Sequence, residues 1–139
     1  MKYKHSMLRV SDLGQSLDFF IGKIGMEEVA RYQVETGRFT LVFLAMPSDH
    51  DAQIELTYNW DPEPLAGGRN FGHLAYEVDN IYDTCARFIE RGVAISRPPR
   101  DGYMAFVRSP DGISLEFLQK GEWLAPAEPW ISMPNIGEW

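Results

Sequence analysis

The sequence predicts an α+β fold of two tandem modules, each built from a strand, a helix and three further strands. The first observation behind this prediction is an internal repeat, because the stretch that starts at His5 resembles the stretch that starts at His73. The second is that strand-like alternating segments follow the helical pattern in both copies. We therefore expect a single domain made of module 1 at about 1–60, a linker at 61–70, module 2 at about 71–119 and a tail at 120–139.

The elements of module 1 follow in order from these patterns. A strand runs from His5 to Val10, and Asp12 is a good N-cap for the helix that comes next. Gly25 ends that helix, since a glycine is favoured where the chain turns left-handed after a helix. Strands are expected at 28–33, 39–45 and 53–58. The apolar stripe of the helix consists of Leu13, Leu17, Phe20, Ile21 and Ile24.

Module 2 repeats the same order. A strand runs from His73 to Val78, Asn80 caps the next helix and Gly92 ends it. Strands are expected at 94–97, 103–108 and 114–118, and the last is entered through a turn at 109–112. The apolar stripe of this helix consists of Ile81, Cys85, Phe88 and Ile89.

Composition excludes several classes of protein. Thirteen Lys and Arg against 20 Asp and Glu leave a net charge of −7, and no basic cluster is present, so a nucleic acid is not an expected partner. No apolar run has the length of a membrane span, and the N-terminus lacks the apolar core of a signal peptide. The single cysteine, Cys85, has no partner for an intramolecular disulfide. We expect a cytoplasmic protein.

The tail beyond Lys120 is unlike either module. It contains three prolines, which disfavour a helix, and three of the four tryptophans, which favour burial. We expect it to lie extended over the body of the protein or over a partner subunit. These residues are Pro126, Pro129, Pro134, Trp123, Trp130 and Trp139.

Strand alternation places one histidine and one glutamate of each module on the face that no helix covers. His5 and Arg9 oppose Leu8 and Val10, and Glu55 and Asn59 oppose Ile54 and Leu56. His73 and Glu116 repeat this arrangement in module 2. Imidazole and carboxylate together suit Zn, Ni, Co, Mn or Fe, so the candidate metal ligands are His5, Glu55, His73 and Glu116. His50 has no counterpart in the repeat and is expected in a solvated loop, and Cys85 is expected in the core.

Four segments carry a resemblance to a known family. They are HSMLRVSDL from His5, IELTYNW from Ile54, FGH from Phe71 and SPDGISLE ending at Glu116. Together they resemble glyoxalase I (lactoylglutathione lyase), a family of the vicinal oxygen chelate superfamily. The resemblance implies that the two modules form a cupped sheet around a metal site. It also implies a homodimer with sites at the subunit interface.

The reaction that this resemblance implies is the isomerisation of the methylglyoxal–glutathione hemithioacetal to S-lactoylglutathione, which detoxifies methylglyoxal. A divalent ion held by the four ligands would stabilise an enediolate. Glu116 would be the base that moves the proton, with Glu55 as its counterpart. The resemblance places Arg9, Asn59 and Arg69 on glutathione, the co-substrate. The chain is similar to the short bacterial type, which prefers nickel or cobalt, with zinc as the alternative.

One segment departs from the family pattern. The stretch 96–103 is short and has no lysine, where family members carry a longer Lys- and Gly-containing loop. Arg97 and Arg100 are the candidates to supply the positive charge, although the two side chain types are not interchangeable at a shaped anion site.

Two other functions remain open at this point. One is another enzyme of the superfamily, an epimerase or a ring-cleaving dioxygenase; Glu55 argues against the dioxygenase, and Asn59 argues against the epimerase. The other is a metal-free small-molecule binding protein, against which the four-ligand set argues.

Overall fold

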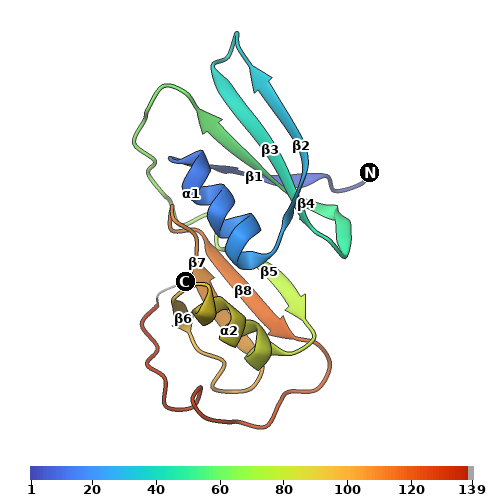
Figure 1. The fold of residues 1–139 in the computed structure, drawn as a ribbon, viewed down its shortest axis with the longest axis vertical. Coiled ribbons are helices and arrows are strands. Elements are labelled where there is room, and N and C mark those ends of the chain that lie inside the picture. The colour runs from blue at the N-terminus through green and yellow to red at the C-terminus, as the bar shows by residue number, and fades with distance from the viewer. Residues whose placement is uncertain (138–139) are drawn as a thin grey trace. The chain divides into compact units, whose positions relative to one another are not determined.

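The computed structural model describes residues 1–137, and the chain divides into two compact units, Met1–Gly67 and Gly68–Trp139 (Figure 1). Each unit has a four-stranded sheet and one helical segment in the order strand, helix, three strands. The predicted α+β fold class is confirmed. Among the described residues, none of the helices is both long and apolar enough to span a membrane.

The sheet of the first unit has the strand order β1-β4-β3-β2. β1 pairs in parallel with β4, and the other two pairs are antiparallel. Leu8 and Leu56 are buried, as the predicted phase of their strands requires, and Leu44 is buried as well. The elements are β1 (His5–Arg9), α1 (Leu13–Leu17), η1 (Asp18–Ile24), β2 (Glu27–Val34), β3 (Phe39–Met46) and β4 (Asp49–Asn59).

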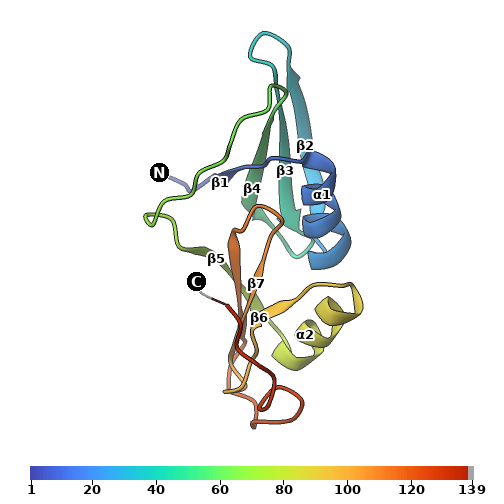
Figure 2. The same ribbon diagram turned by 90° about the vertical axis from the view of Figure 1, so that its left-hand side faces the viewer.

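The sheet of the second unit repeats this topology with the order β5-β8-β7-β6, in which β5 and β8 are parallel. Figure 2 shows α2 against one face of this sheet, and Ile81, Phe88 and Phe117 are buried between the two layers. The opposite face of the sheet carries the side chains that alternate with these along the strands, His73 and Glu116 among them. The elements are β5 (His73–Val78), α2 (Ile81–Glu90), β6 (Ile95–Arg97), β7 (Met104–Arg108) and β8 (Ser114–Gln119).

The first helical segment is not a regular α-helix. It begins as predicted, with the Asp12 carboxylate accepting a hydrogen bond of 2.8 Å from the Gln15 amide, and it ends at Gly25 with φ of 100°. The α-helical turns stop at Leu17, however, and 18–24 form a π-helix. A π turn contains one residue more than an α turn, so the buried positions shift. The buried side chains are Ser16, Phe19, Phe20 and Ile24, whereas the predicted Leu13, Leu17 and Ile21 are only partly buried.

The second helix is regular and differs from its prediction at one position. The Asn80 side chain accepts hydrogen bonds from the amides of Tyr82 and Asp83, and Gly92 ends the helix with φ of 75°. Ile89 was expected in the apolar stripe, but its side chain is 46% exposed, and Thr84 is buried instead. Because Thr84 lies one turn from Ile81 and Phe88, it shares their face. Burial raises the pKa of the Cys85 thiol in this stripe to about 12.

β4 begins earlier than predicted, at Asp49, because a two-residue turn joins it to β3. His50 therefore lies in a strand rather than in a loop. It remains largely exposed, as expected, and pairs with Glu27.

The described part of the tail packs on its own unit. Trp130 is buried and stacks on Tyr82 with ring centroids 5.9 Å apart, whereas Trp123 stacks on Tyr103 but stays 62% exposed. The Leu124 amide donates to the Gly102 carbonyl at 3.0 Å. Gly102 has φ of 74°, and a Cβ there would lie 1.9 Å from the Leu124 carbonyl oxygen, so this close approach requires glycine. Trp139 lies outside the described residues.

Candidate functional site

The first histidine–glutamate pair lies on the parallel strands β1 and β4. The Nε2 atom of His5 is 2.9 Å from the Oε2 atom of Glu55. The Thr57 hydroxyl donates to the other oxygen of Glu55 at 3.0 Å, and the Phe43 and His5 rings pack in a T-shaped arrangement with centroids 5.3 Å apart. The Glu55 side chain is 14% exposed, so this carboxylate is sheltered but still open to a ligand.

The second pair lies at the matching place in the other unit, on the parallel strands β5 and β8. The Nε2 atom of His73 is 3.2 Å from the Oε2 atom of Glu116, whose side chain is 13% exposed. The Phe106 and His73 rings also pack in a T-shaped arrangement with centroids 5.3 Å apart, the same separation as between Phe43 and His5. The repeat seen in the sequence is therefore a repeat in three dimensions, down to the aromatic ring beside each histidine.

Sequence reasoning missed these two phenylalanines. The signal was available, since Phe43 and Phe106 are the register partners of Glu55 and Glu116 on the next strand. Register partners share a face of the sheet. The order of the strands, however, is known only from the fold.

The four predicted metal ligands thus come as two pairs, one in each unit. Within residues 1–137 no three or more His, Cys, Asp or Glu side chains gather as a metal-binding group. Each pair offers one imidazole nitrogen and one carboxylate, the donor types that borderline divalent ions accept.

Arg9 and Asn59, both predicted to bind substrate, come together in the first unit. They line one pocket of about 140 Å³ with Glu63 from the linker. The Asn59 side-chain amide donates to Oε1 of Glu63, and the Arg9 Nε atom lies 3.6 Å from the same oxygen. Glu63 was not identified from the sequence, because nothing in a linker indicates which side chain will fold back onto the strands.

Arg69, the third predicted substrate contact, lines a larger pocket of about 320 Å³ in the second unit. Arg108, at the end of β7, lines the same pocket. Sequence reasoning did not single out Arg108, although it alternates with Phe106 along the strand and therefore shares its face.

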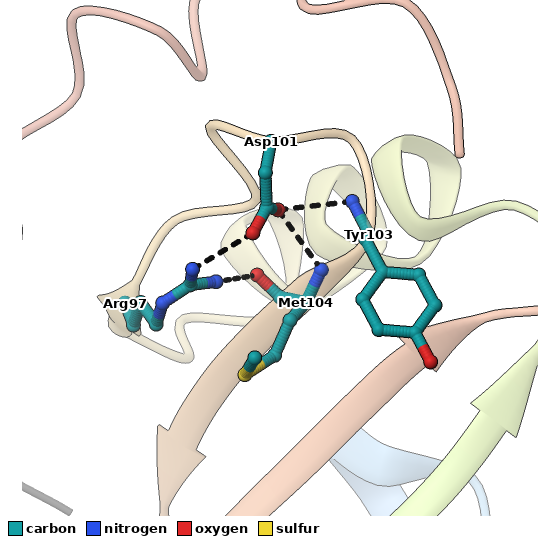
Figure 3. A network of polar contacts seen from close by, with 4 residues as sticks. All are labelled: Arg97, Asp101, Tyr103 and Met104. Atoms are coloured by element: carbon teal, nitrogen blue, oxygen red, sulfur yellow. Dashed lines mark hydrogen bonds and ion pairs between the residues drawn. The ribbon is translucent and has the colours of Figure 1, made fainter.

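The two arginines of the segment 96–103 bind groups of their own unit, and Figure 3 shows the contacts of Arg97. The Arg97 Nη2 atom lies 2.8 Å from the Asp101 carboxylate, and its Nη1 donates to the Met104 carbonyl. The amides of Tyr103 and Met104 donate to Asp101 at 3.0 and 3.1 Å. Burial alone would raise the pKa of Asp101, but these hydrogen bonds and the Arg97 charge outweigh it and hold the pKa below its ordinary value.

Arg100, for its part, donates twice to the Met133 carbonyl of the tail, at 2.6 Å from Nη2 and 3.1 Å from Nε. Arg97 and Arg100 thus stabilise the short segment and the tail rather than reaching outward. The two positive charges expected to bind an anion from this stretch therefore contact groups of the protein itself.

The chain is similar to known proteins over most of its length. A family model described as the Glyoxalase/Bleomycin resistance protein/Dioxygenase superfamily matches residues 2–117. A lactoylglutathione lyase from Neisseria meningitidis serogroup A is 41% identical over 126 residues, which cover 86% of this chain and 91% of that protein. A lactoylglutathione lyase from Salmonella typhimurium is 35% identical, and the match covers 86% of this chain and 93% of that protein.

Solved structures show the same likeness. The trypanothione-dependent glyoxalase I of Leishmania major superimposes with a TM-score of 0.78 at 32% identity, covering 86% of this chain and 87% of that one. The glyoxalase I of Zea mays superimposes with a TM-score of 0.77 at 27% identity, covering 87% of this chain and 45% of that one.

Proposed function

Because the chain belongs to the Glyoxalase/Bleomycin resistance protein/Dioxygenase superfamily and, within it, to the lactoylglutathione lyase (glyoxalase I) family, we propose that it isomerises the methylglyoxal–glutathione hemithioacetal to S-lactoylglutathione. The resemblance read from the sequence motifs is confirmed, and the chain is an enzyme of this family. The observation that carries the proposed reaction is the repeated histidine–glutamate pair, since one such pair stands at the same place in each unit.

The donor set fits a divalent metal ion. Two imidazoles and two carboxylates suit nickel, cobalt and zinc, and we propose nickel or cobalt as the native ion. The residues that would hold it are His5, Glu55, His73 and Glu116. Bound there, the ion would stabilise the negative charge that develops on two adjacent substrate oxygens when a proton leaves the neighbouring carbon.

Glu116 is our proposed base. A positioned carboxylate can remove the proton from one carbon and return it to the next, while the hydroxyl proton passes from one substrate oxygen to the neighbouring one. The surroundings of the two carboxylates support this choice over Glu55. The Thr57 hydroxyl holds Glu55 at 3.0 Å, whereas Glu116 has no partner besides His73 among the residues that the structure describes. Glu116 is therefore freer to change its position during a proton transfer.

The substrate contacts that we propose are Arg9, Asn59 and Arg69. Guanidinium and amide groups suit the carboxylates of glutathione. The pocket shared by Arg9 and Asn59 supports their acting together. We further propose a cytoplasmic homodimer in which each site takes its ligands from both subunits.

The first test is a measurement of activity. Chelator-treated protein is reconstituted with nickel, cobalt or zinc in turn and mixed with the preformed hemithioacetal, and the absorbance of the product thioester is followed. A rise in absorbance with at least one metal is expected. Equilibrium dialysis of the same samples measures bound metal; no rise despite stoichiometric metal contradicts the proposed reaction, and no stoichiometric metal at all favours a metal-free binding protein.

The second test asks where the ligands of one site come from. Two inactive variants, His5→Gln and His73→Gln, are unfolded together and refolded so that mixed dimers form. If a site combines His5 of one subunit with His73 of the other, half of the sites in a mixed dimer are intact and activity returns. Failure of the mixture to regain activity, while wild-type protein treated in the same way does, contradicts sites shared between subunits.

A further inference from the structure

Arg108 lies on the same face of its sheet as the second histidine–glutamate pair. Its register partner on β8 is Ser114, and the partner of Ser114 on β5 is His73. Register partners on neighbouring strands direct their side chains to one face, so Arg108, Ser114 and His73 form one row across the sheet. The next row consists of Phe106, Glu116 and Ala75. Arg108 is therefore one row away from the proposed base.

The first unit has no cation at the corresponding place. There the row that contains His5 runs through Gln53 to Ala45, which is buried. The two sheets match at the histidine, at the glutamate and at the phenylalanine, but they differ here, with alanine in one and arginine in the other. Arg108 is thus a feature of the second unit alone and is not repeated in the first.

The pocket beside Arg108 suits an anion. Among residues 1–137, Arg108 and Arg69 are the charged side chains that line it, together with Gly68, Gly72, Gly112, Ser114 and Phe71. Neither arginine forms an ion pair with any residue in the described part of the chain. In a protein with a net charge of −7, two exposed guanidinium groups without carboxylate partners form a local positive site.

The glycines leave room for a ligand. A Cβ atom built on Gly68, Gly72 or Gly112 would meet nothing within 4 Å. With a volume of about 320 Å³, the pocket can accept the end of a peptide. Guanidinium groups bind carboxylates through pairs of parallel hydrogen bonds, which makes an arginine pair selective for such a group.

We propose that Arg108, together with Arg69, binds a carboxylate of the thiol co-substrate, and that Arg108 is a specificity-determining residue for anionic thiols. The inference rests on the proposed function, because it assigns part of that substrate. It also accounts for the segment 96–103, which lacks the usual lysine and whose two arginines are bound to Asp101 and to the Met133 carbonyl. Arg108 supplies from β7 the charge that this segment does not provide.

The test combines changes in the protein with changes in the substrate. The variants are Arg108→Gln and Arg108→Lys, with Arg87→Gln as the matched control, since Arg87 is an arginine of the same unit on the outer helix α2. Each metal-loaded protein is assayed with hemithioacetals of glutathione, of glutathione esterified at the glycine carboxylate, and of glutathione amidated at the γ-glutamyl carboxylate. Calorimetric titration with S-methylglutathione, which cannot react, measures binding separately.

We expect the variant to bind the anionic substrate more weakly but to turn it over at a similar rate. In Arg108→Gln the KM for the glutathione adduct rises about tenfold while kcat stays within about twofold, because a contact to a carboxylate that does not react is made equally in the ground state and in the transition state. Wild-type enzyme discriminates against both modified substrates, and the variant loses its discrimination against one of them, which identifies the carboxylate that Arg108 binds. Arg108→Lys retains part of the effect, and Arg87→Gln behaves like the wild type.

Three outcomes would overturn the inference, and they separate it from the proposed function. If the wild type turns over the glutathione adduct and Arg108→Gln keeps both its KM and its discrimination, only the role of Arg108 is wrong. If the wild type neither turns over the adduct nor binds S-methylglutathione, the proposed function is wrong and this inference with it. If it binds without turnover, weaker binding by Arg108→Gln still supports the carboxylate site, and unchanged binding contradicts it.

Discussion

His73 and Glu116 lie on neighbouring parallel strands with Nε2 and Oε2 3.2 Å apart, and His5 and Glu55 repeat this relationship at 2.9 Å. The repeat is close but not complete, because the Thr57 hydroxyl donates to Glu55 and β8 carries Leu118 at the corresponding place beyond Glu116. A carboxylate held by a hydroxyl is less able to move than one that is not. The two units therefore offer the same donor types, but the Glu116 side chain is freer to move than that of Glu55. This difference suits our proposal that Glu116 transfers the proton and Glu55 stays in place.

Replacing Glu116 by Gln removes the proposed base while keeping the shape of the side chain. We expect kcat for the hemithioacetal to fall by roughly 10²- to 10⁴-fold, the usual contribution of a positioned general base. Glu90→Gln, at the exposed end of α2, is the charge-matched control and should keep wild-type activity. Circular dichroism and sedimentation show whether fold and assembly are retained. Near-wild-type turnover by Glu116→Gln would falsify the assignment of the base.

Replacing Phe106 by Ala tests how strongly the second unit depends on the ring beside His73. Phe106 is 2% exposed, so its removal leaves a cavity in the core. The free energy of unfolding should fall by about 3–5 kcal/mol, as for other buried phenylalanines. Urea denaturation measures the change, and Tyr32→Ala, at a 56% exposed aromatic residue, is the control. A loss of less than about 1 kcal/mol would mean that the ring is not part of a well-packed core.

Asp101→Asn tests the network that holds the segment 96–103. The folded pKa of Asp101 lies below its ordinary value of 3.8, so its ionised form stabilises the fold above that pH, and this stabilisation is lost as the pH falls through the folded pKa. At pH 7 the variant should be less stable by roughly 1–3 kcal/mol, since it loses charge-assisted hydrogen bonds.

The difference between the wild type and Asp101→Asn should shrink as the pH is lowered below 3.8, because the wild-type carboxyl then becomes neutral as well. Urea unfolding at a series of pH values measures this difference. A gap that stays constant down to acid unfolding would contradict the role of the charge. Asp83→Asn, on the exposed side of α2, controls for the loss of one acid elsewhere.

Glu63→Gln tests whether the linker competes with substrate. The Glu63 carboxylate contacts both Arg9 and Asn59, the groups that we propose bind a substrate carboxylate. Removing its charge should lower the KM for the glutathione adduct by roughly two- to fivefold, the size expected for an exposed ion pair. Glu35→Gln, an exposed acid of the same unit, should leave KM unchanged. A rise in KM would show instead that Glu63 positions Arg9 and Asn59 for binding.

Local signals in the sequence predicted most of the fold well. Asp12 and Asn80 cap their helices, and Gly25 and Gly92 end them with positive φ, because these features depend on a few neighbouring residues. The π-helix at 18–24 and the exposure of Ile89 were not predicted, since both depend on how a helix meets its sheet. Propensity and periodicity carry no information about that contact.

For the candidate site, too, the sequence predicted some features and not others. Alternation along single strands was enough to put His5, Glu55, His73 and Glu116 on the open faces of their sheets, because a side chain's face follows from its position in the strand alone. Which residues touch was decided only by the pairing of strands, which brings together side chains 50 positions apart, as in His5 and Glu55, or returns the linker's Glu63 to Arg9. The same holds for Arg108, whose row with His73 exists because β8 lies between β7 and β5. The sequence by itself thus determined the elements and their faces, and the tertiary structure decided the contacts, since a contact depends on which strands become neighbours in a sheet, which no local pattern specifies.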